Sequence, residues 1–185
     1  YQHYGVEPDM VTMAKGVASG YAAIACLVTT EAVFDLFKSD ASDPLDYFRD
    51  ISTFGGCTAG PAAALENMRI IEDEDLPGQC ADKGDRLIAA LRAALGNHPH
   101  VGDIRGKGLF QAIEFVRDTS TKEQFPADVA FGIRVGKRAL QNGLLCRFDP
   151  HWIAFGPPLT TTAEQLDEMV AVLDQSIGEI LDELS

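Results

Sequence analysis

The last two dozen residues carry a long amphipathic pattern that limits how this chain can fold. Apolar side chains recur there every three or four residues, with acidic residues between them. The apolar positions are Leu166, Met169, Val170, Leu173, Ile177, Ile180, Leu181 and Leu184. This spacing predicts one helix with a stripe that must be buried against other elements and an acidic face in water. Thr161 followed by Glu164 predicts a capping box at its start.

Upstream of that helix, predicted strands and helices alternate. Leucines four residues apart predict a helix from about residue 80 to 95, and a second helix ends at the C-cap signal Asn142–Gly143. Short apolar runs predict three strands. These elements cover residues 80–95, 109–116, 126–141, 144–148 and 152–155. The second half is therefore predicted to be an α/β or α+β unit whose small sheet is covered by helices.

The first half contains fewer regular elements. A buried strand is predicted at Met10–Met13, a second strand at Ala23–Val28, and helices at 31–37 and from Pro61 to about Glu74. Leu76-Pro77-Gly78 then interrupts the pattern. We therefore expect two domains, residues 1–76 and residues 77–185.

The composition of the chain argues against several kinds of binding partner and cellular environment. The chain has 185 residues with 28 acidic and 15 basic side chains, a formal net charge of −13, which argues against nucleic acid or an anionic membrane surface. The longest apolar run, Tyr21–Val28, is too short to cross a bilayer, which predicts a soluble protein. The four cysteines lie far apart without a C-x-x-C pair, so they indicate no metal site or disulfide framework. We expect reduced core thiols in a cytoplasmic protein.

Lys15 differs from the other five lysines in its surroundings. It follows the predicted strand Met10–Met13, and its immediate neighbours are the small residues Ala14 and Gly16. Removing an ammonium group from water lowers its pKa and supplies the free amine that a Schiff-base nucleophile needs. The alternative is a lysine whose stem packs on the sheet while its amine reaches solvent.

Two further positions are candidates for binding anions. Ser52-Thr53 before Gly55-Gly56 offers hydroxyls and unhindered backbone N–H groups, which suit a phosphate or form an ordinary loop. Arg147 lies in an apolar strand, where its guanidinium can bind a substrate carboxylate or form an internal salt bridge. Arg105 is expected to tie a turn together through its neighbouring acid, Asp103.

Several segments match one family in order and spacing. Residues 4–16, YGVEPDMVTMAKG, continued by Ser19-Gly20-Tyr21, strongly resemble the segment of class III (ω-type) aminotransferases that carries the lysine bound to pyridoxal phosphate. Residues 52–56, STFGG, resemble the loop whose threonine reaches the cofactor phosphate of the other subunit. Residues 102–109 and 155–159 resemble the entry to the C-terminal sheet and the segment before the last helix.

This resemblance implies an α/β fold of the type I class of pyridoxal-phosphate enzymes. Residues 1–76 would be the end of the large cofactor domain and residues 77–185 the C-terminal small domain. Lys15 would hold the cofactor as a Schiff base, and Ser52 and Thr53 would bind its phosphate across a homodimer. Arg147 matches the mobile arginine that binds the substrate carboxylate. The implied reaction moves an amino group from an ω-amino acid or amine to a keto acid, with pyruvate as the expected acceptor.

Two departures from the family pattern bear on this reading. Relatives that act on ornithine-like substrates place an arginine where this chain has Ala154, and relatives often place proline where it has Ala23. The resemblance covers only the later part of the family's pattern, and the chain begins at Tyr1. We therefore expect a fragment that is inactive alone. The alternatives are a decarboxylase or aminomutase of the same fold, or a non-catalytic dimerisation fragment.

Overall fold

The chain divides into two compact units. The structure is a computed structural model that describes residues 1–38, 42–43, 48 and 50–184. The first unit is Tyr1–Glu74 and the second is Asp75–Ser185. This division falls two residues before the expected domain boundary after residue 76.

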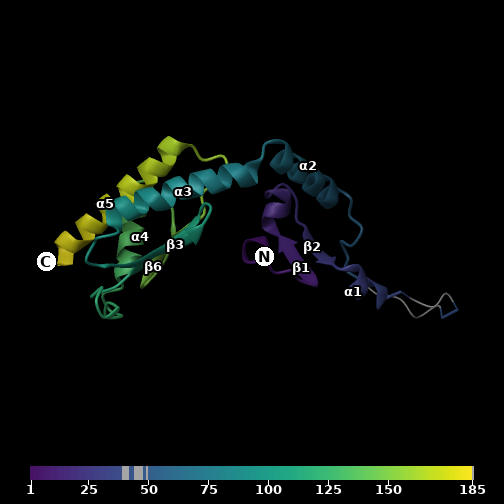
Figure 1. Cartoon of the computed structure of the whole chain (residues 1–185), viewed down its shortest axis with the longest axis horizontal. Coiled ribbons are helices and arrows are strands. Elements are labelled where there is room, and N and C mark those ends of the chain that lie inside the picture. Colours follow the sequence, from purple (N-terminus) through teal and green to yellow (C-terminus); the bar gives the residue numbers. More distant parts are fainter. Residues whose placement is uncertain (39–41, 44–47, 49, 185) are drawn as a thin grey trace. The chain divides into compact units, whose positions relative to one another are not determined.

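The first unit is built around a two-stranded antiparallel sheet. Met13 pairs with Cys26, and Ala14 pairs with Ala25. Short 3-10 turns precede and follow the first strand, and two helices come after the second (Figure 1). The elements are η1 (Gln2–Tyr4), β1 (Met10–Ala14), η2 (Lys15–Ala18), β2 (Ala25–Thr29), α1 (Glu31–Asp35) and α2 (Ala59–Asp73). Both strands and both helices thus form where the apolar pattern predicted them, to within a few residues.

The expectation that the first of these strands is buried is wrong. Most positions of β1 and β2 are exposed, and Ala18 and Ala64 are the fully buried apolar side chains among this unit's described residues. The physical reason is that α2 packs on η2, while among the described residues of this unit no helix makes extensive contact with the two-stranded sheet. Two strands and one helix cannot enclose the apolar side chains of this segment.

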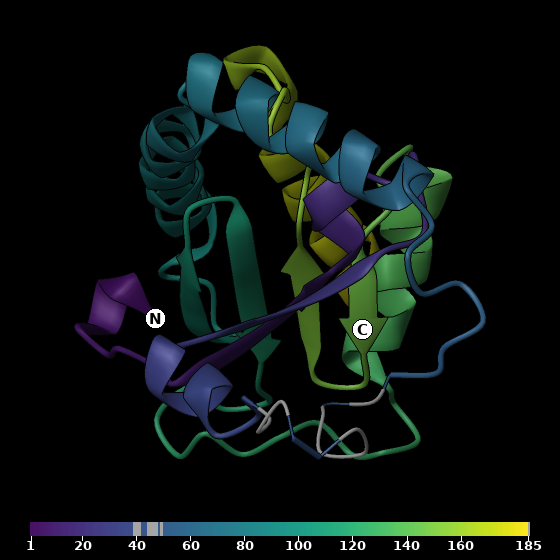
Figure 2. The same ribbon diagram turned by 90° about the vertical axis from the view of Figure 1, so that its right-hand side faces the viewer.

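The second unit is a four-stranded antiparallel sheet with three helices. The strand order is β3-β4-β6-β5. Helix α3 lies against β3 and β4, α4 lies against β5 and β6, and α5 packs on both α3 and α4 (Figure 2). The elements are α3 (Leu76–Leu95), β3 (Val101–Lys107), β4 (Phe110–Phe115), α4 (Phe131–Gln141), β5 (Arg147–Asp149), β6 (Trp152–Phe155) and α5 (Ala163–Leu184). A small sheet covered by helices was the predicted architecture, and it is confirmed.

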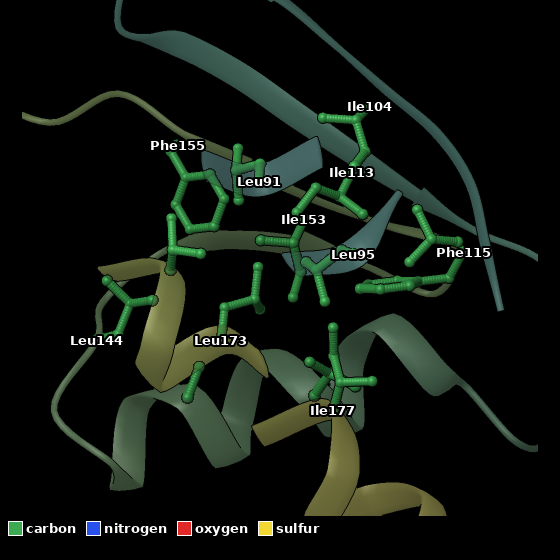
Figure 3. Packing of buried hydrophobic residues seen from close by; sticks show 14 of the residues in the cluster. Leu91, Leu95, Ile104, Ile113, Phe115, Leu144, Ile153, Phe155, Leu173 and Ile177 are labelled. Carbon is green, nitrogen blue, oxygen red and sulfur yellow. The ribbon is translucent and has the colours of Figure 1, made fainter. Parts of the chain in front are cut away.

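Strand alternation separates the core from the open face of this sheet. Ile104, Ile113 and Ile153 pair with one another across three strands and are buried. They meet helix side chains such as Leu95 and Ile177 in one apolar cluster (Figure 3). Because successive side chains of a strand point to opposite faces, the neighbouring positions lie on the other face. Those positions include Arg105, Ala112, Ala154 and Arg147, which form one cross-strand row.

Two predicted helix starts are corrected by the structure. Helix α3 begins at Leu76 rather than near residue 80, because the Asp75 carboxylate accepts a hydrogen bond from the Gly78 N–H and Pro77 sits in the first turn, where no N–H is needed. The capping box of α5 uses Thr162 and Gln165, one residue later than predicted. The Thr162 N–H donates to Gln165 Oε1, and the Gln165 N–H donates to Thr162 Oγ1.

Gly84 lets α3 approach the turn between β3 and β4. A Cβ atom at Gly84 would lie 2.4 Å from the backbone of Gly108, whereas one at Gly178 in α5 would meet nothing within 4 Å. We expect Gly84→Ala to lower the free energy of unfolding by about 1–3 kcal/mol through overpacking. Gly178→Ala should raise it by about 0.5–1 kcal/mol. Urea denaturation, followed by the fluorescence of the single tryptophan, Trp152, measures the free energy of unfolding of both variants. Equal stability of Gly84→Ala and Gly178→Ala would contradict the close approach of α3 to Gly108.

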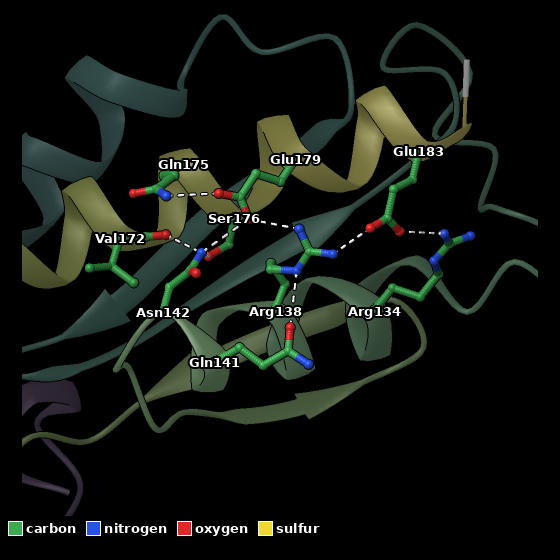
Figure 4. A network of polar contacts seen from close by, with 9 residues as sticks. All are labelled: Arg134, Arg138, Gln141, Asn142, Val172, Gln175, Ser176, Glu179 and Glu183. Carbon is green, nitrogen blue, oxygen red and sulfur yellow. Dashed lines mark hydrogen bonds and ion pairs between the residues drawn. The ribbon is translucent and has the colours of Figure 1, made fainter.

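A polar network joins α4 to α5 (Figure 4). Arg138 Nη1 donates to Glu179 Oε2 at 2.8 Å, and Arg138 also bonds Glu183. Glu179 accepts two more hydrogen bonds, from Gln175 Nε2 at 2.7 Å and from Asn142 Nδ2 at 3.2 Å. These donors favour the charged carboxylate and lower the pKa of Glu179 to about 2.

The lowered pKa of Glu179 predicts an acid-sensitive contact between α4 and α5. A carboxylate whose pKa is depressed by folding contributes stability above its ordinary value near 4.5, and this is lost as the pH falls toward 2. We expect Glu179→Gln to be less stable at neutral pH and to lose less stability between these pH values. Urea denaturation at a series of pH values, with Glu72→Gln as the control, tests this. A wild-type slope in Glu179→Gln would exclude the contribution.

Candidate functional site

Lys15 lies where β1 ends and η2 begins. Its backbone is left-handed, with φ +56°, which is uncommon for a residue other than glycine. Its side chain borders an open hollow of about 800 Å³ whose walls come from β1 and β2. Residues Thr12, Met13, Cys26 and Leu27 contribute to these walls. Lys15 therefore lies beside an open hollow whose walls are largely apolar, and such a hollow can hold a small organic molecule.

The structure corrects one part of the argument for Lys15. Lys15 is exposed, and so is most of β1, since no second layer covers the β1–β2 sheet. Within the described chain, Lys15 is therefore not withdrawn from water as the sequence suggested. The left-handed backbone is a feature that sequence reasoning did not identify.

Ser52 and Thr53 lie in an exposed turn, and neither lines the hollow beside Lys15. The Ser52 hydroxyl and N–H both donate to Asp50 Oδ1, at 2.6 and 2.9 Å. These two bonds lower the pKa of Asp50. Thr53 makes no hydrogen bond to another described residue. An anion at this turn would meet a carboxylate beside Ser52, so Thr53 is the better donor of the pair.

Arg147 is exposed on the open face of the second unit's sheet. It pairs in register with Ala154 of β6, and its guanidinium carbon lies 5.8 Å from the centre of the Trp152 ring. It forms no ion pair with any described acid, so the alternative of an internal salt bridge is not what the structure shows. Arg105, by contrast, bonds Asp103 at 2.8 Å and Glu114 at 2.9 Å. That pairing with Asp103 was predicted, although Arg105 lies in β3 rather than in a turn.

A groove of about 1070 Å³ opens beside Arg147. It lies between the loop that precedes β5, the segment that follows β6 and the start of α5. Apolar side chains such as Phe155 and Met169 share its walls with Thr162 and Gln165. A charged guanidinium at the edge of a largely apolar groove can bind a small organic anion.

The four cysteines differ in burial and surroundings. Cys146 lines the groove beside Arg147, and burial raises the pKa of this thiol to about 11, which keeps it protonated at neutral pH. All four cysteines are free, but Cys57 is exposed, and Cys26, Cys80 and Cys146 are only partly buried. The expectation of four core thiols is therefore wrong.

Asn67 was missed by the sequence reasoning. Its Nδ2 donates to the carbonyl oxygens of Gly16 and Val17, each at 2.9 Å. Its only signal in the sequence is a polar side chain three residues after Ala64 on the packed face of α2.

Among the described residues, no helix is both long and apolar enough to cross a bilayer.

Comparison with known proteins identifies relatives over nearly the whole chain. A family model described as aminotransferase class-III matches residues 1–177. The taurine–pyruvate aminotransferase of Bilophila wadsworthia is 49% identical, over 95% of this chain and 40% of its own length. The hypotaurine/taurine–pyruvate aminotransferase of Paracoccus denitrificans is 47% identical, over 97% and 40%. This chain thus spans about 40% of the length of these relatives.

Solved structures of transaminases are also similar to this chain. An (S)-enantioselective ω-transaminase from Thermomicrobium roseum superposes with a TM-score of 0.87 at 34% identity, over 98% of this chain and 39% of its own. An amine transaminase from an uncultivated Pseudomonas species, in its PLP-bound form, superposes with a TM-score of 0.84 at 28% identity, over 97% and 40%. The predicted α/β fold of the type I pyridoxal-phosphate class is confirmed.

Proposed function

Because the chain belongs to the class III aminotransferases, we propose that it forms part of a pyridoxal-phosphate-dependent transaminase. The reaction moves an amino group from an ω-amino acid or amine to pyruvate, and taurine is the donor that the names of the similar proteins favour. The match over residues 1–177 is the observation that carries the proposal. We assign residues 1–76 to the end of the cofactor domain and residues 77–185 to the small domain.

Lys15 is the residue proposed to hold the cofactor. Its Nζ would bond covalently to the cofactor aldehyde in the hollow between β1 and β2. When the amine of the donor takes its place, the freed Nζ becomes a base that can move a proton at the carbon bearing the amino group. Pyridoxal phosphate supplies the electron sink that makes this proton acidic.

Thr53 is proposed to bind the cofactor phosphate of a partner subunit. Its hydroxyl is exposed and is not used by another described residue, whereas the Ser52 hydroxyl is held by Asp50. Ser52 would then order the turn through its two hydrogen bonds to Asp50, and Thr53 would donate the hydrogen bond to the phosphate. A phosphate site completed by a second copy requires a homodimer.

Arg147 is proposed to bind the anionic group of the substrate. Its guanidinium has no acidic partner among the described residues and borders the groove. A guanidinium fork fits the carboxylate of pyruvate, and it fits a sulfonate in the same way. For an uncharged amine donor the side chain would move aside.

The free cysteines support a cytoplasmic enzyme.

The reaction can be tested in a chimera. This chain would replace the matched segment of the Bilophila wadsworthia relative, and taurine, pyruvate and pyridoxal phosphate would be supplied. We expect one alanine formed for each taurine consumed. Release of carbon dioxide from an ω-amino acid supplied in place of taurine, or isomerisation of the donor, without formation of alanine would favour another reaction of the fold. The 185-residue chain alone should form no alanine, and activity of the chain alone would contradict the expectation of an inactive fragment.

A further inference from the structure

One face of α2 packs closely against the turn that follows Lys15. Gly60, Ala64 and Asn67 lie four and then three residues apart, which places them on one side of the helix. Gly60 and Ala64 are buried, and Asn67 is partly buried. This side of α2 meets η2, where Ala18 is completely buried. The close contact between the helix and the turn therefore depends on small side chains.

The small residues bring the helix within hydrogen-bonding reach of the turn. A Cβ atom at Gly60 would lie 3.3 Å from the carbonyl oxygen of Ala23, so at this end α2 lies close to the backbone that leads from η2 to β2. About two turns farther along α2, Asn67 Nδ2 donates to Gly16 O and Val17 O, each at 2.9 Å. An amide nitrogen has two hydrogens, and both are used on consecutive carbonyls.

These carbonyls belong to the two residues that directly follow Lys15. Lys15 is left-handed, and Ser19, which ends the turn, is also left-handed with φ +50°. Residues other than glycine keep such conformations only where their surroundings impose them. Pairing of Ala14 with Ala25 holds the chain before Lys15. After Lys15, the hydrogen bonds from Asn67 hold the turn from another element.

We propose that Asn67 is a positioning residue for Lys15. By holding the carbonyls of Gly16 and Val17, it keeps the backbone of Lys15 left-handed and directs the amine toward the hollow between β1 and β2. The inference rests on the proposed function for the meaning of Lys15. Its geometric part, control of the Lys15 backbone by Asn67, can be measured without cofactor.

The geometric part is tested by NMR on the 185-residue chain. A left-handed residue has a short distance between its amide proton and its own Hα, which gives a strong intraresidue NOE. In the wild-type chain we expect this NOE at Lys15, and NOEs from the Asn67 side-chain amide protons to Gly16 and Val17. Absence of both sets of NOEs in wild type would overturn the proposal without any variant having to fold.

Two substitutions then remove the donors while keeping the side chain similar in size. Asn67→Leu has no polar atom, and Asn67→Asp places a carboxylate against two carbonyl oxygens. Both should weaken the NOE at Lys15 and speed deuterium exchange at the Ser19 amide, which donates to Gly16 O. The control is Gln175→Ala, which removes a side-chain hydrogen bond from α5 and should change neither signal.

The functional part is tested in the chimera. Pyridoxal phosphate is added, borohydride is used to fix it, and the fraction fixed on Lys15 is measured by peptide mass per folded molecule. In Asn67→Leu we expect this fraction at limiting cofactor to fall by about three- to tenfold, with no change in Gln175→Ala. If Asn67→Leu alters the NOE at Lys15 and the exchange of the Ser19 amide but leaves the fraction of cofactor fixed on Lys15 unchanged, the positioning role is overturned. If the wild-type chimera fixes no cofactor on Lys15, the proposed function fails, while the NMR result still decides the geometry.

Discussion

Replacing Lys15 with alanine in the chimera is expected to reduce kcat for transamination by at least about 10²–10⁴-fold. This is the range that removal of a general acid–base group produces, and Lys15 is also proposed to hold the cofactor. The variant should lose the visible absorption of bound pyridoxal phosphate at the same time. Steady-state alanine formation and an absorption spectrum of the purified protein measure both effects.

Lys137→Ala is the matched control for this experiment. Lys137 is an exposed lysine of α4, so its removal should leave both the rate and the spectrum unchanged. A visible band that persists in Lys15→Ala, and that borohydride still fixes to protein, would refute the role assigned to Lys15.

Arg147→Ala is expected to lower kcat/KM for pyruvate by about 10- to 100-fold. The loss of a charged hydrogen-bonding partner for an anion has about this effect. Taurine carries a sulfonate and should also lose binding, whereas an uncharged amine donor should be affected far less. Arg147→Lys should recover part of the loss, because it restores the charge but not the planar fork.

Arg105→Ala provides the control for Arg147. Arg105 lies in the same cross-strand row, but Asp103 and Glu114 already hold it. Its removal should leave KM for pyruvate unchanged. Initial rates with pyruvate varied against each donor distinguish the cases. Equal losses for pyruvate and an uncharged amine in Arg147→Ala would count against carboxylate binding.

The secondary structure could be predicted wherever apolar spacing was regular. Helix α5 and the alternating strand β4 follow directly from their apolar patterns, because burial of those side chains decides the element. The predicted starts of the helices were less accurate than the predicted existence of the helices. Thr161 and Thr162 both offer a hydroxyl, and residue types alone do not distinguish them, whereas in the structure Thr162 accepts the hydrogen bond from the Gln165 N–H. Likewise, Pro77 can end a helix or begin one. The Asp75 carboxylate caps the first turn, so here Pro77 lies at the start of α3.

The candidate site could be predicted only in part. The segment around Lys15 is distinctive in sequence, and the structure places this lysine at a hollow. Its exposure could not be predicted, because a strand of apolar residues looks the same whether or not another layer covers it. Asn67 could not be found from sequence, since its partners are main-chain carbonyls some 50 residues away. Such contacts leave no pattern in residue type or spacing.

The most direct test of the account is to identify the amine to which the cofactor binds. The chimera would be incubated with pyridoxal phosphate, reduced with borohydride, digested and examined by peptide mass spectrometry. We predict that the added pyridoxyl mass is found on Lys15 and on no other lysine of this chain. A coloured protein whose label lies on a different lysine, with Lys15 unmodified, would contradict the account.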